Sequence, residues 1–247
     1  MDVGRVIGRT LVELCITVGA LIVLLTCYLL FWTDISANNA MAGELSQLQQ
    51  QWSSAQAASS GQGSGQPTDQ PTVAASGTTP SPAPSPSLTA YPPGQAFAVL
   101  YIPRMGADWK KPIIEGVAET DLQKGIGHYT GTAEPGQPGN FALAGHRRTW
   151  GNPFNDFPLL RPGDKIFIDD GHYWYVYVLD REPFRTLPTD IHVLDPVPPE
   201  SGYTTPGSYL TLTTCDPAWG HSHRLIEWGH LVSTTPVSQG PPPGVNA

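Results

Sequence analysis

The feature that most constrains this chain is an uncharged apolar stretch near its N-terminus. Residues 14–32, LCITVGALIVLLTCYLLFW, contain no Asp, Glu, Lys or Arg. As a helix rising about 1.5 Å per residue, they span about 28 Å, close to the hydrocarbon thickness of a bilayer. A cleaved signal peptide usually has a shorter apolar region that ends in small residues, whereas this stretch ends in aromatic ones. We therefore predict an uncleaved transmembrane helix at residues 14–32.

Charges beside the apolar stretch predict its orientation. Arg5 and Arg9 precede it and Asp34 follows it, and no second stretch of this kind occurs in the sequence. The positive-inside rule then leaves the N-terminus in the cytoplasm. We expect a single-pass protein of the cell membrane, with residues 1–13 as a cytoplasmic tail and everything beyond residue 32 outside the cell.

A segment of simple composition follows the apolar stretch. Met41, Leu45, Leu48 and Trp52 are spaced four, three and four residues apart, which permits a short amphipathic or coiled-coil extension of the helix. Beyond residue 52 the chain is mostly Ala, Ser, Gly, Gln, Thr and Pro, and such a composition cannot bury a core. We predict a low-complexity extracellular linker at 33–93, one domain at 94–236 and a disordered tail at 237–247.

The domain at 94–236 has the pattern of a β protein. Seven short segments are rich in β-branched and aromatic residues: 96–102, 111–117, 139–146, 164–170, 172–180, 208–215 and 223–232. An Asp-Gly pair at residues 170–171 separates two of them and predicts a hairpin. Only two segments of the domain have the pattern of short helical turns, residues 118–125 and 152–160. The fold class is therefore mostly β, as a closed or nearly closed barrel with short helices.

Charge and cysteine content narrow the function. Thirteen basic residues against 21 acidic ones give a net charge of −8, which argues against a nucleic-acid partner. Of the three cysteines, Cys15 and Cys27 lie in the predicted membrane helix, so Cys215 is the only one in the exported part. A lone exported cysteine is either an intermolecular bridge or a reactive thiol.

Polar residues that could activate Cys215 occur elsewhere in the sequence. A nucleophilic thiolate needs a nearby base or cation. His146 follows a predicted strand, and Arg224 lies nine residues beyond Cys215 at the start of the next one. A short loop between two adjacent strands would place Cys215 and Arg224 side by side. His128 is a competing candidate for the base.

The residues around Cys215 resemble the signature of the sortases. TLTTC (residues 211–215) matches their TLxTC motif, with the upstream histidine in AGHR and the downstream arginine in CDPAWGHSHR. Over roughly residues 95–235 the sequence is most similar to the actinobacterial class E sortases. The resemblance implies an eight-stranded sortase-type β-barrel and a membrane-bound cysteine transpeptidase. Such enzymes cleave a C-terminal sorting signal of surface proteins between Thr and Gly, and they pass the acyl group to an amine of a lipid-linked peptidoglycan precursor.

The same resemblance assigns roles to individual residues. Cys215 is expected to be the nucleophile, His146 the general acid and base, and Arg224 the residue that stabilises the oxyanion. Thr214 is expected to contact the sorting signal beside the thiol. Tyr129 corresponds to a tyrosine that is associated, in class E enzymes, with a preference for LAxTG over LPxTG signals. No cofactor and no metal ion are implied.

Three alternative functions are compatible with parts of the sequence. Cys215, His221 and His223 could form part of a zinc site, although their spacing fits no common structural zinc motif. A surface module linked through a Cys215 disulfide is a second alternative, and a pilus-polymerising or other-class sortase is a third. The nucleophile motifs of NlpC/P60 peptidases and of L,D-transpeptidases are absent from the sequence.

Overall fold

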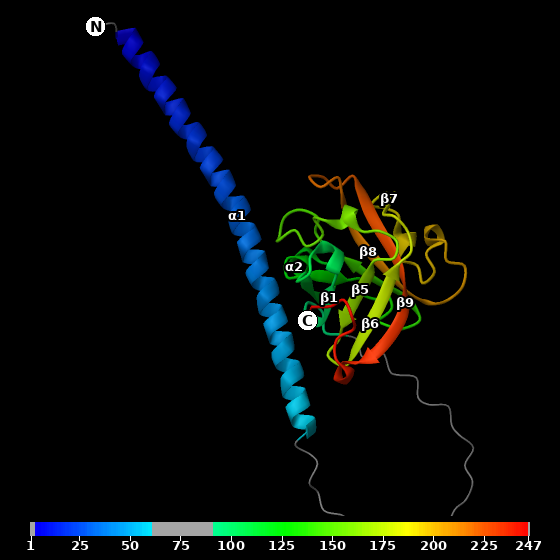
Figure 1. The fold of residues 1–247 in the computed structure, drawn as a ribbon. Coiled ribbons are helices and arrows are strands. Elements are labelled where there is room, and N and C mark those ends of the chain that lie inside the picture. The colour runs from blue at the N-terminus through cyan, green and yellow to red at the C-terminus, as the bar shows by residue number, and fades with distance from the viewer. Residues whose placement is uncertain (1–2, 61–90, 247) are drawn as a thin grey trace, which may run out of the picture.

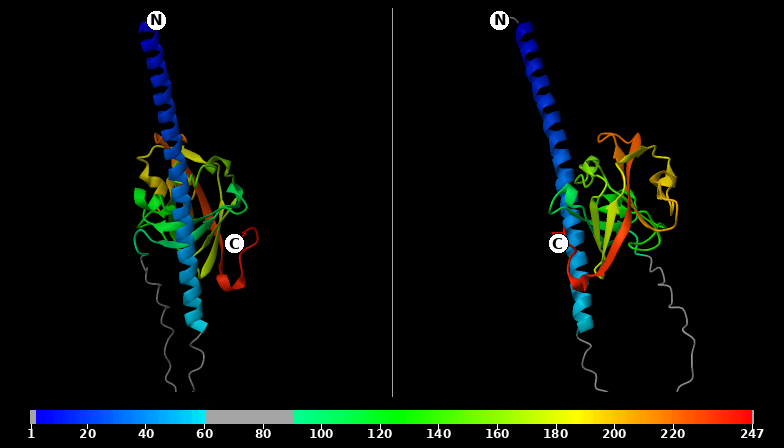
Figure 2. Two further views of the ribbon diagram at one scale, coloured as in Figure 1. Left: turned by 90° about the vertical axis from the view of Figure 1, so that its left-hand side faces the viewer. Right: turned by 45° about the vertical axis from the view of Figure 1, so that its right-hand side comes forward.

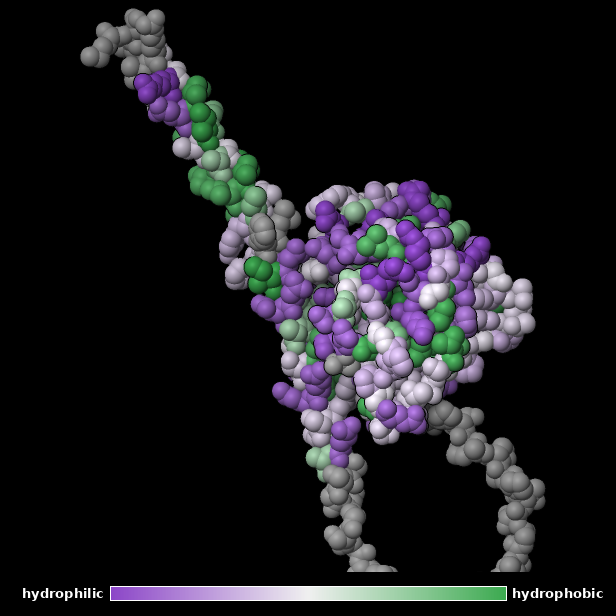
Figure 3. Space-filling model, viewed as in Figure 1, coloured by the Kyte–Doolittle hydropathy of each residue, from purple (hydrophilic) through white to green (hydrophobic). Residues whose placement is uncertain are grey.

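One long helix and one β-barrel make up the part of the chain that the structure describes, residues 3–60 and 91–246 of a computed structural model (Figure 1). Helix α1 (Val3–Ser60) is continuous. Its stretch Ile7–Tyr28 has a mean hydropathy of 2.3 and no buried residue, so it is long and apolar enough to cross a membrane. Figure 3 shows this half of the helix as largely hydrophobic and free of contact with the barrel. The predicted apolar N-terminal helix is confirmed.

The helix continues well beyond the apolar stretch. Residues 33–60, which the sequence placed in the linker, belong to α1, and the rest of the predicted linker, 61–90, falls outside the described residues. The helical part is rich in Ala, Ser and Gln, and Ala and Gln are good helix formers. Three of its apolar side chains, Ala37, Met41 and Leu48, are buried. The amphipathic face predicted from the spacing therefore exists, but it packs on this chain's own barrel.

Nine strands form a single sheet. They are β1 (Ala96–Tyr101), β2 (Lys110–Glu115), β3 (Ile126–His128), β4 (Gly139–Ala144), β5 (Lys165–Asp169), β6 (Tyr173–Leu179), β7 (Phe184–Thr186), β8 (Ser208–Asp216) and β9 (His223–Pro236). The short helices are α2 (Glu119–Leu122), η1 (Pro103–Met105), η2 (Phe157–Leu159), η3 (Ile191–Leu194), η4 (Pro199–Ser201) and η5 (Val237–Gln239).

The sheet closes into an eight-stranded barrel. Its order is β6-β5-β1-β2-β3-β4-β8-β9, and β9 pairs with β6 again, while β7 adds to β9 outside this ring. The pairs β2–β3 and β4–β8 are parallel and the others are antiparallel. The eight-stranded barrel expected from the sequence is confirmed.

Alternation along the strands explains why α1 packs where it does. In β1, Ala98 and Leu100 point into the barrel core, whereas Val99 and Tyr101 belong to a second apolar cluster outside it. Strands β5 and β6 alternate in the same way, as a period of two requires. Leu48 of α1 completes this outer cluster. Figure 2 shows α1 lying along this side of the barrel.

A glycine permits the closest approach of helix and barrel. Gly171, in the predicted β5–β6 hairpin, has φ +84°, and a Cβ there would lie 2.5 Å from the indole of Trp52 on α1. Another residue at this turn would be strained and would push the helix away. The Asp-Gly turn therefore serves the helix contact as well as the hairpin.

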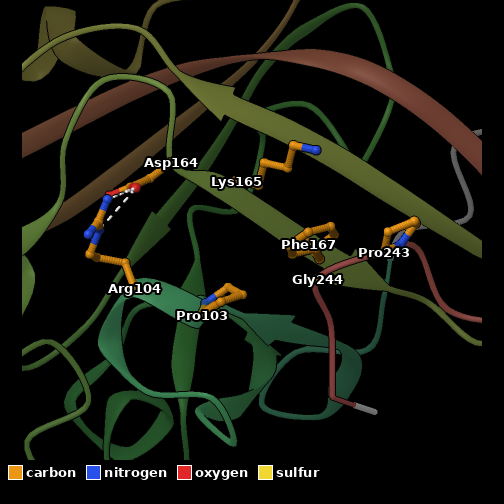
Figure 4. A pocket seen from close by; sticks show the side chains of 7 residues that line it. All are labelled: Pro103, Arg104, Asp164, Lys165, Phe167, Pro243 and Gly244. Carbon is orange, nitrogen blue, oxygen red and sulfur yellow. Dashed lines mark hydrogen bonds and ion pairs between the residues drawn. The ribbon is translucent and has the colours of Figure 1, made fainter.

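The sequence pattern missed two strands and the packing of the C-terminal tail. Strands β3 and β7 have only three residues each, too few to show a period. Within the predicted disordered tail, Val237 and Val245 pack against the outer apolar cluster. There the tail covers a hollow of about 420 Å³, lined by Pro103, Arg104, Asp164, Lys165, Phe167, Pro243 and Gly244 (Figure 4). Arg104 and Asp164 form a bidentate ion pair at its rim.

Candidate active site

Strands β8 and β9 bring Cys215 and Arg224 together. The two residues are direct partners in the antiparallel register, so their side chains leave the sheet on the same face. The thiol is free and half-buried. Arg224 donates hydrogen bonds from Nη1 to the carbonyl oxygens of His221 (3.2 Å) and His223 (3.0 Å). The predicted juxtaposition of Cys215 and Arg224 is thus present in the structure.

Strand β4 supplies His146 from the other side of β8. The two strands are parallel, with Ala144 opposite Thr213, and the amide of Gly145 donates to the Thr213 carbonyl at 3.1 Å. Continuing this register by two residues sets His146 opposite Cys215. The two side chains share a pocket of about 280 Å³ with Arg147, Arg148, Thr149, Ala218, Trp219, Gly220 and His221. The ends of three adjacent strands, β4, β8 and β9, therefore present histidine, cysteine and arginine side by side, with His146 two residues beyond β4.

The side chain of His146 is half-buried, and its Nε2 atom is shielded from solvent. Its Nε2 has no hydrogen-bond partner among the described residues. Burial lowers the pKa of His146 below its ordinary value, and Glu119 offsets only part of this effect. The lowered pKa favours the neutral ring, which is the form that can accept a proton.

Thr214 lies on the opposite face of β8 from the thiol. Leu210 and Leu212 belong to the barrel core, so alternation turns Thr214 inward and Cys215 outward. Thr214 is 3% exposed, and its hydroxyl donates to the carbonyl of Gly145 at 2.8 Å. Its side chain thus holds β8 against the end of β4, next to His146.

Tyr129 lies on the outer face of β8. It follows β3, is half-buried, and its hydroxyl is 3.1 Å from Oγ1 of Thr213, two residues before Cys215. It therefore lies near the strand end that carries Cys215, without lining the pocket around the thiol.

The competing histidine, His128, is fully engaged elsewhere. It is buried, with Nδ1 2.5 Å from Oε2 of Glu115. Its Nε2 is 3.0 Å from the hydroxyl of Thr132 and 3.1 Å from the carbonyl of Ala133. His128 also does not line the pocket of Cys215, so His146 is the histidine available to the thiol.

An ion-pair network that the sequence did not predict surrounds the thiol. Asp216 accepts a hydrogen bond from Arg147 (2.5 Å) on one side and from Arg185 of β7 (2.6 Å) on the other. Arg185 also contacts Nδ1 of His223 at 2.9 Å. The sequence predicted none of these contacts, and of these residues only His223 was considered there, as a possible zinc ligand. The only feature of the sequence that could have indicated this network is Asp216 itself, which directly follows the candidate nucleophile Cys215.

The zinc alternative gains no support from the described residues. Among residues 3–60 and 91–246, no three His, Cys, Asp or Glu side chains cluster as metal ligands would. His223, one of the three proposed ligands, has its Nδ1 beside Arg185 and the Ser222 hydroxyl.

A closed barrel with histidine, cysteine and arginine at the ends of adjacent strands defines a class of protein, and comparison with known families agrees. The sortase domain model matches residues 100–232. The chain belongs to the sortase family, whose members are cysteine transpeptidases.

The relatives are class E enzymes, as the resemblance predicted. Sortase SrtE1 of Streptomyces coelicolor is 36% identical over 244 residues, covering 96% of this chain and 60% of that protein. The chain thus spans less than two thirds of the length of this relative. Sortase SrtE2 of the same organism is 30% identical, covering 95% of this chain and 87% of its own length.

Solved structures agree with this assignment. Sortase E from Streptomyces avermitilis is 55% identical, with a TM-score of 0.60, and the match covers 63% of this chain and all of that one. Sortase E1 from Streptomyces coelicolor, solved with a tripeptide in the active site, is 41% identical. Its TM-score is 0.58, and the match covers 63% of this chain and 99% of that one.

Proposed function

We propose that this chain is a membrane-anchored cysteine transpeptidase that cleaves an LAxTG- or LPxTG-type C-terminal sorting signal between Thr and Gly. In this proposal it joins the threonine carbonyl of a surface protein to an amine of a lipid-linked peptidoglycan precursor. The observation that carries the proposal is the placement of Cys215 on β8 between two residues: Arg224, its register partner on β9, and His146, just after the end of β4, which lines one pocket with the thiol. A relative solved with a tripeptide in its active site supports a peptide substrate.

The first step forms the thioacyl intermediate. The neutral ring of His146 accepts the thiol proton of Cys215, and the thiolate attacks the carbonyl carbon of the Thr–Gly bond. Arg224 stabilises the oxyanion of the tetrahedral intermediate. To do so, its guanidinium must exchange a hydrogen bond to the hairpin carbonyls for one to the substrate oxygen. The imidazolium of His146 then donates its proton to the departing glycine amine.

The second step transfers the acyl group. His146, neutral again, accepts a proton from the incoming amine as that amine attacks the thioester. Collapse of the tetrahedral intermediate forms the new amide and expels the Cys215 thiolate, which takes the proton back from His146. The free enzyme is restored, so the cycle needs no cofactor.

Two further residues support the site in this proposal. Tyr129 biases the choice between Ala and Pro in the signal, since its hydroxyl lies beside Thr213 on the face of β8 that bears the thiol. Thr214, which faces inward, acts by holding Gly145 in place, and this positioning role replaces the substrate contact that the sequence suggested.

Anchoring follows from α1. Its stretch Ile7–Tyr28 supplies the membrane span. The arginines before it and Asp34 after it favour a cytoplasmic N-terminus and an extracellular barrel.

The test uses the full chain in detergent micelles, with Cys15 and Cys27 replaced by alanine so that only Cys215 can react. We expect LAxTG and LPxTG peptides to give an adduct on Cys215, cut after Thr and detected by mass spectrometry. Cys215→Ala is the matched control and should give none. A folded chain with a titratable thiol that forms no adduct with either peptide would contradict the proposed substrate.

A further inference from the structure

Helix α1 touches the barrel first at the loop that carries His146. Asp34 accepts hydrogen bonds from the amide of Gly151 (3.1 Å) and from Nδ2 of Asn152 (3.4 Å). Gly151 has φ +76°, and a Cβ there would lie 2.9 Å from Oδ1 of Asn38 on the helix. The helix and the loop after β4 thus approach closely, only five residues beyond His146.

The contact continues down the helix. Met41 is buried about two turns beyond Asp34, and Leu48, 3% exposed, packs on the outer face of β1, β5 and β6. Trp52 extends the contact over the turn at Gly171. A helix held at points about 27 Å apart, from Asp34 to Trp52 at about 1.5 Å per residue, is fixed in direction as well as in position.

This contact places the catalytic end of the barrel next to the apolar span. The span ends at Tyr28, six residues before Asp34 and therefore about 9 Å away along the helix. Tyr28 and Trp32 are exposed and stack with their ring centroids 5.8 Å apart, the arrangement expected of an aromatic belt at a bilayer surface. In Figures 1 and 2 the β8–β9 loop (orange) lies at the barrel end nearer the N-terminal half of α1.

The rim of the pocket carries the side chains that a bilayer surface favours. Trp219, in the β8–β9 loop, is 73% exposed, and the guanidinium carbon of Arg148 lies 4.1 Å from the centre of its ring. Tryptophan and arginine side chains are suited to the headgroup region, where an amphipathic ring and a cation meet lipid phosphates. An exposed indole has no evident role in stabilising the barrel itself.

We propose that α1 holds the barrel with its Cys215 pocket turned towards the membrane, and that Trp219 and Arg148 contact phospholipid headgroups. The inference rests on the proposed membrane anchoring. It means that the pocket opens at the bilayer surface, where the lipid-linked acceptor of the proposed function lies. A barrel on a free tether would instead present every face to the membrane equally.

The first experiment compares two labelled positions in the full chain, reconstituted in nanodiscs that contain anionic lipid. In a background with alanine at all three native cysteines, Ser222→Cys labels the β8–β9 loop and Ser233→Cys labels an exposed site on β9. The positions are about 36 Å apart along the strand. With headgroup-nitroxide lipids, we expect quenching of an environment-insensitive dye to be at least about twofold stronger at position 222.

Each outcome has a definite meaning. A chain that does not incorporate into lipid overturns the anchoring and this inference with it. A chain that incorporates but shows equal quenching at both positions overturns the orientation alone and leaves the proposed function intact.

A matched pair of helix variants tests whether α1 sets the orientation. Leu48→Asp places a charge in the buried contact, and Gln50→Asp places the same charge on an exposed site two residues on. We expect Leu48→Asp to equalise the two labels while the circular dichroism of the barrel is unchanged. Gln50→Asp should preserve the difference, and persistence of the difference in Leu48→Asp would contradict the role of the helix.

The headgroup contact has its own readout. The difference in fluorescence between the native chain and the Trp219→Phe variant gives the emission of Trp219 alone. We expect this component to be quenched by nitroxide at the headgroup and much less by nitroxide deep in the acyl chains. A component that neither lipid quenches would overturn the contact.

Discussion

Arg147 and Asp216 are ion-paired, with Nη1 of the arginine 2.5 Å from Oδ1 of the aspartate. Each directly follows a residue of the proposed mechanism, Arg147 after His146 and Asp216 after Cys215. Both partners are largely buried, at 13% and 17% exposed, and Arg147 also reaches the carbonyl of Cys215 at 3.4 Å. The pair therefore fixes the spacing between base and nucleophile through the backbone on either side of them.

Neutralising Asp216 should slow catalysis without unfolding the barrel. Burial alone would raise the pKa of Asp216, but the hydrogen bonds from Arg185 and Arg147 hold it below its ordinary value, so the carboxylate is ionised at neutral pH. Asp216→Asn removes this charge and loosens the His146 loop. We expect the rate of thioacyl formation to fall by about tenfold or more, since small misplacement of reacting groups is costly. Asp108→Asn, an exposed site, is the control and should retain the wild-type rate.

Cys215→Ala should abolish thioacyl formation while the protein stays folded. The thiol is half-buried at a strand end and forms no disulfide, so its loss leaves only a small gap. We expect the melting temperature to change by no more than about 2 °C. Residual turnover of either peptide by this variant would contradict the assignment of the nucleophile.

The protonation of His146 can be measured directly. Burial lowers its pKa, whereas the hydrogen bond to Asp195 raises the pKa of His192, which is fully exposed. Nuclear magnetic resonance titration of the full chain in micelles should therefore find His146 titrating below about 6.5 and His192 above it. His146→Gln identifies the signal. A midpoint for His146 above that of His192 would mean that the free enzyme holds an imidazolium.

Removing the Tyr129 hydroxyl should change substrate preference more than overall rate. The hydroxyl contacts Thr213 on the outer face of β8, beside the site but outside the thiol pocket. We expect Tyr129→Phe to lower the ratio of kcat/KM for LAxTG over LPxTG by about threefold to tenfold, the scale of one lost hydrogen bond. Tyr173→Phe alters an exposed tyrosine on β6 and should leave the ratio unchanged.

The buried carboxyl group of Glu227 should make the stability of the folded barrel depend on pH. It is 1% exposed, and neither carboxylate oxygen has a hydrogen-bond partner among the described residues. Burial, with smaller contributions from Glu182 and Asp164, raises its pKa from 4.5 to about 8. Because the folded state holds this proton more tightly than the unfolded chain, its contribution to stability is present below about pH 4.5 and is lost as the pH rises towards 8.

The variant Glu227→Gln cannot ionise and so avoids this loss. We expect its melting temperature to exceed that of the wild type by about 5 °C or more at pH 9, with little difference at pH 4.5. Glu200→Gln, at an exposed site, should show no such trend. Equal melting temperatures at pH 9 would mean that the buried carboxylate is solvated or paired.

The parts of the fold that the sequence predicted are those with a local signal. Seven strand segments, the Asp-Gly hairpin and the Cys215–Arg224 pairing all follow from short-range pattern, and all are present. Strands β3 and β7 were missed because three residues carry no period. Their pairing is decided by neighbours that are distant in the chain.

The contacts that were not predicted all join distant segments. Leu48 was identified as part of an apolar helix face, but its partner on β1 and β5 depends on the alternation of strands 50 residues and more away. Arg147 reads as a solvated loop charge until β4 and β8 are placed side by side, when it meets Asp216. Which residues of two loops meet depends on where the closed sheet places the loops. The sequence of either loop alone therefore does not predict the contact.

Strand β9 begins beside the proposed catalytic arginine and ends by closing the barrel on β6. The last of the described strands in chain order therefore supplies both Arg224 and the pairing that closes the barrel. A chain that has emerged only as far as β8 carries its thiol but has neither Arg224 nor a closed barrel. If the barrel is exported as proposed, we expect such an unfinished chain to be inactive until β9 has crossed the membrane and paired with β8 and β6.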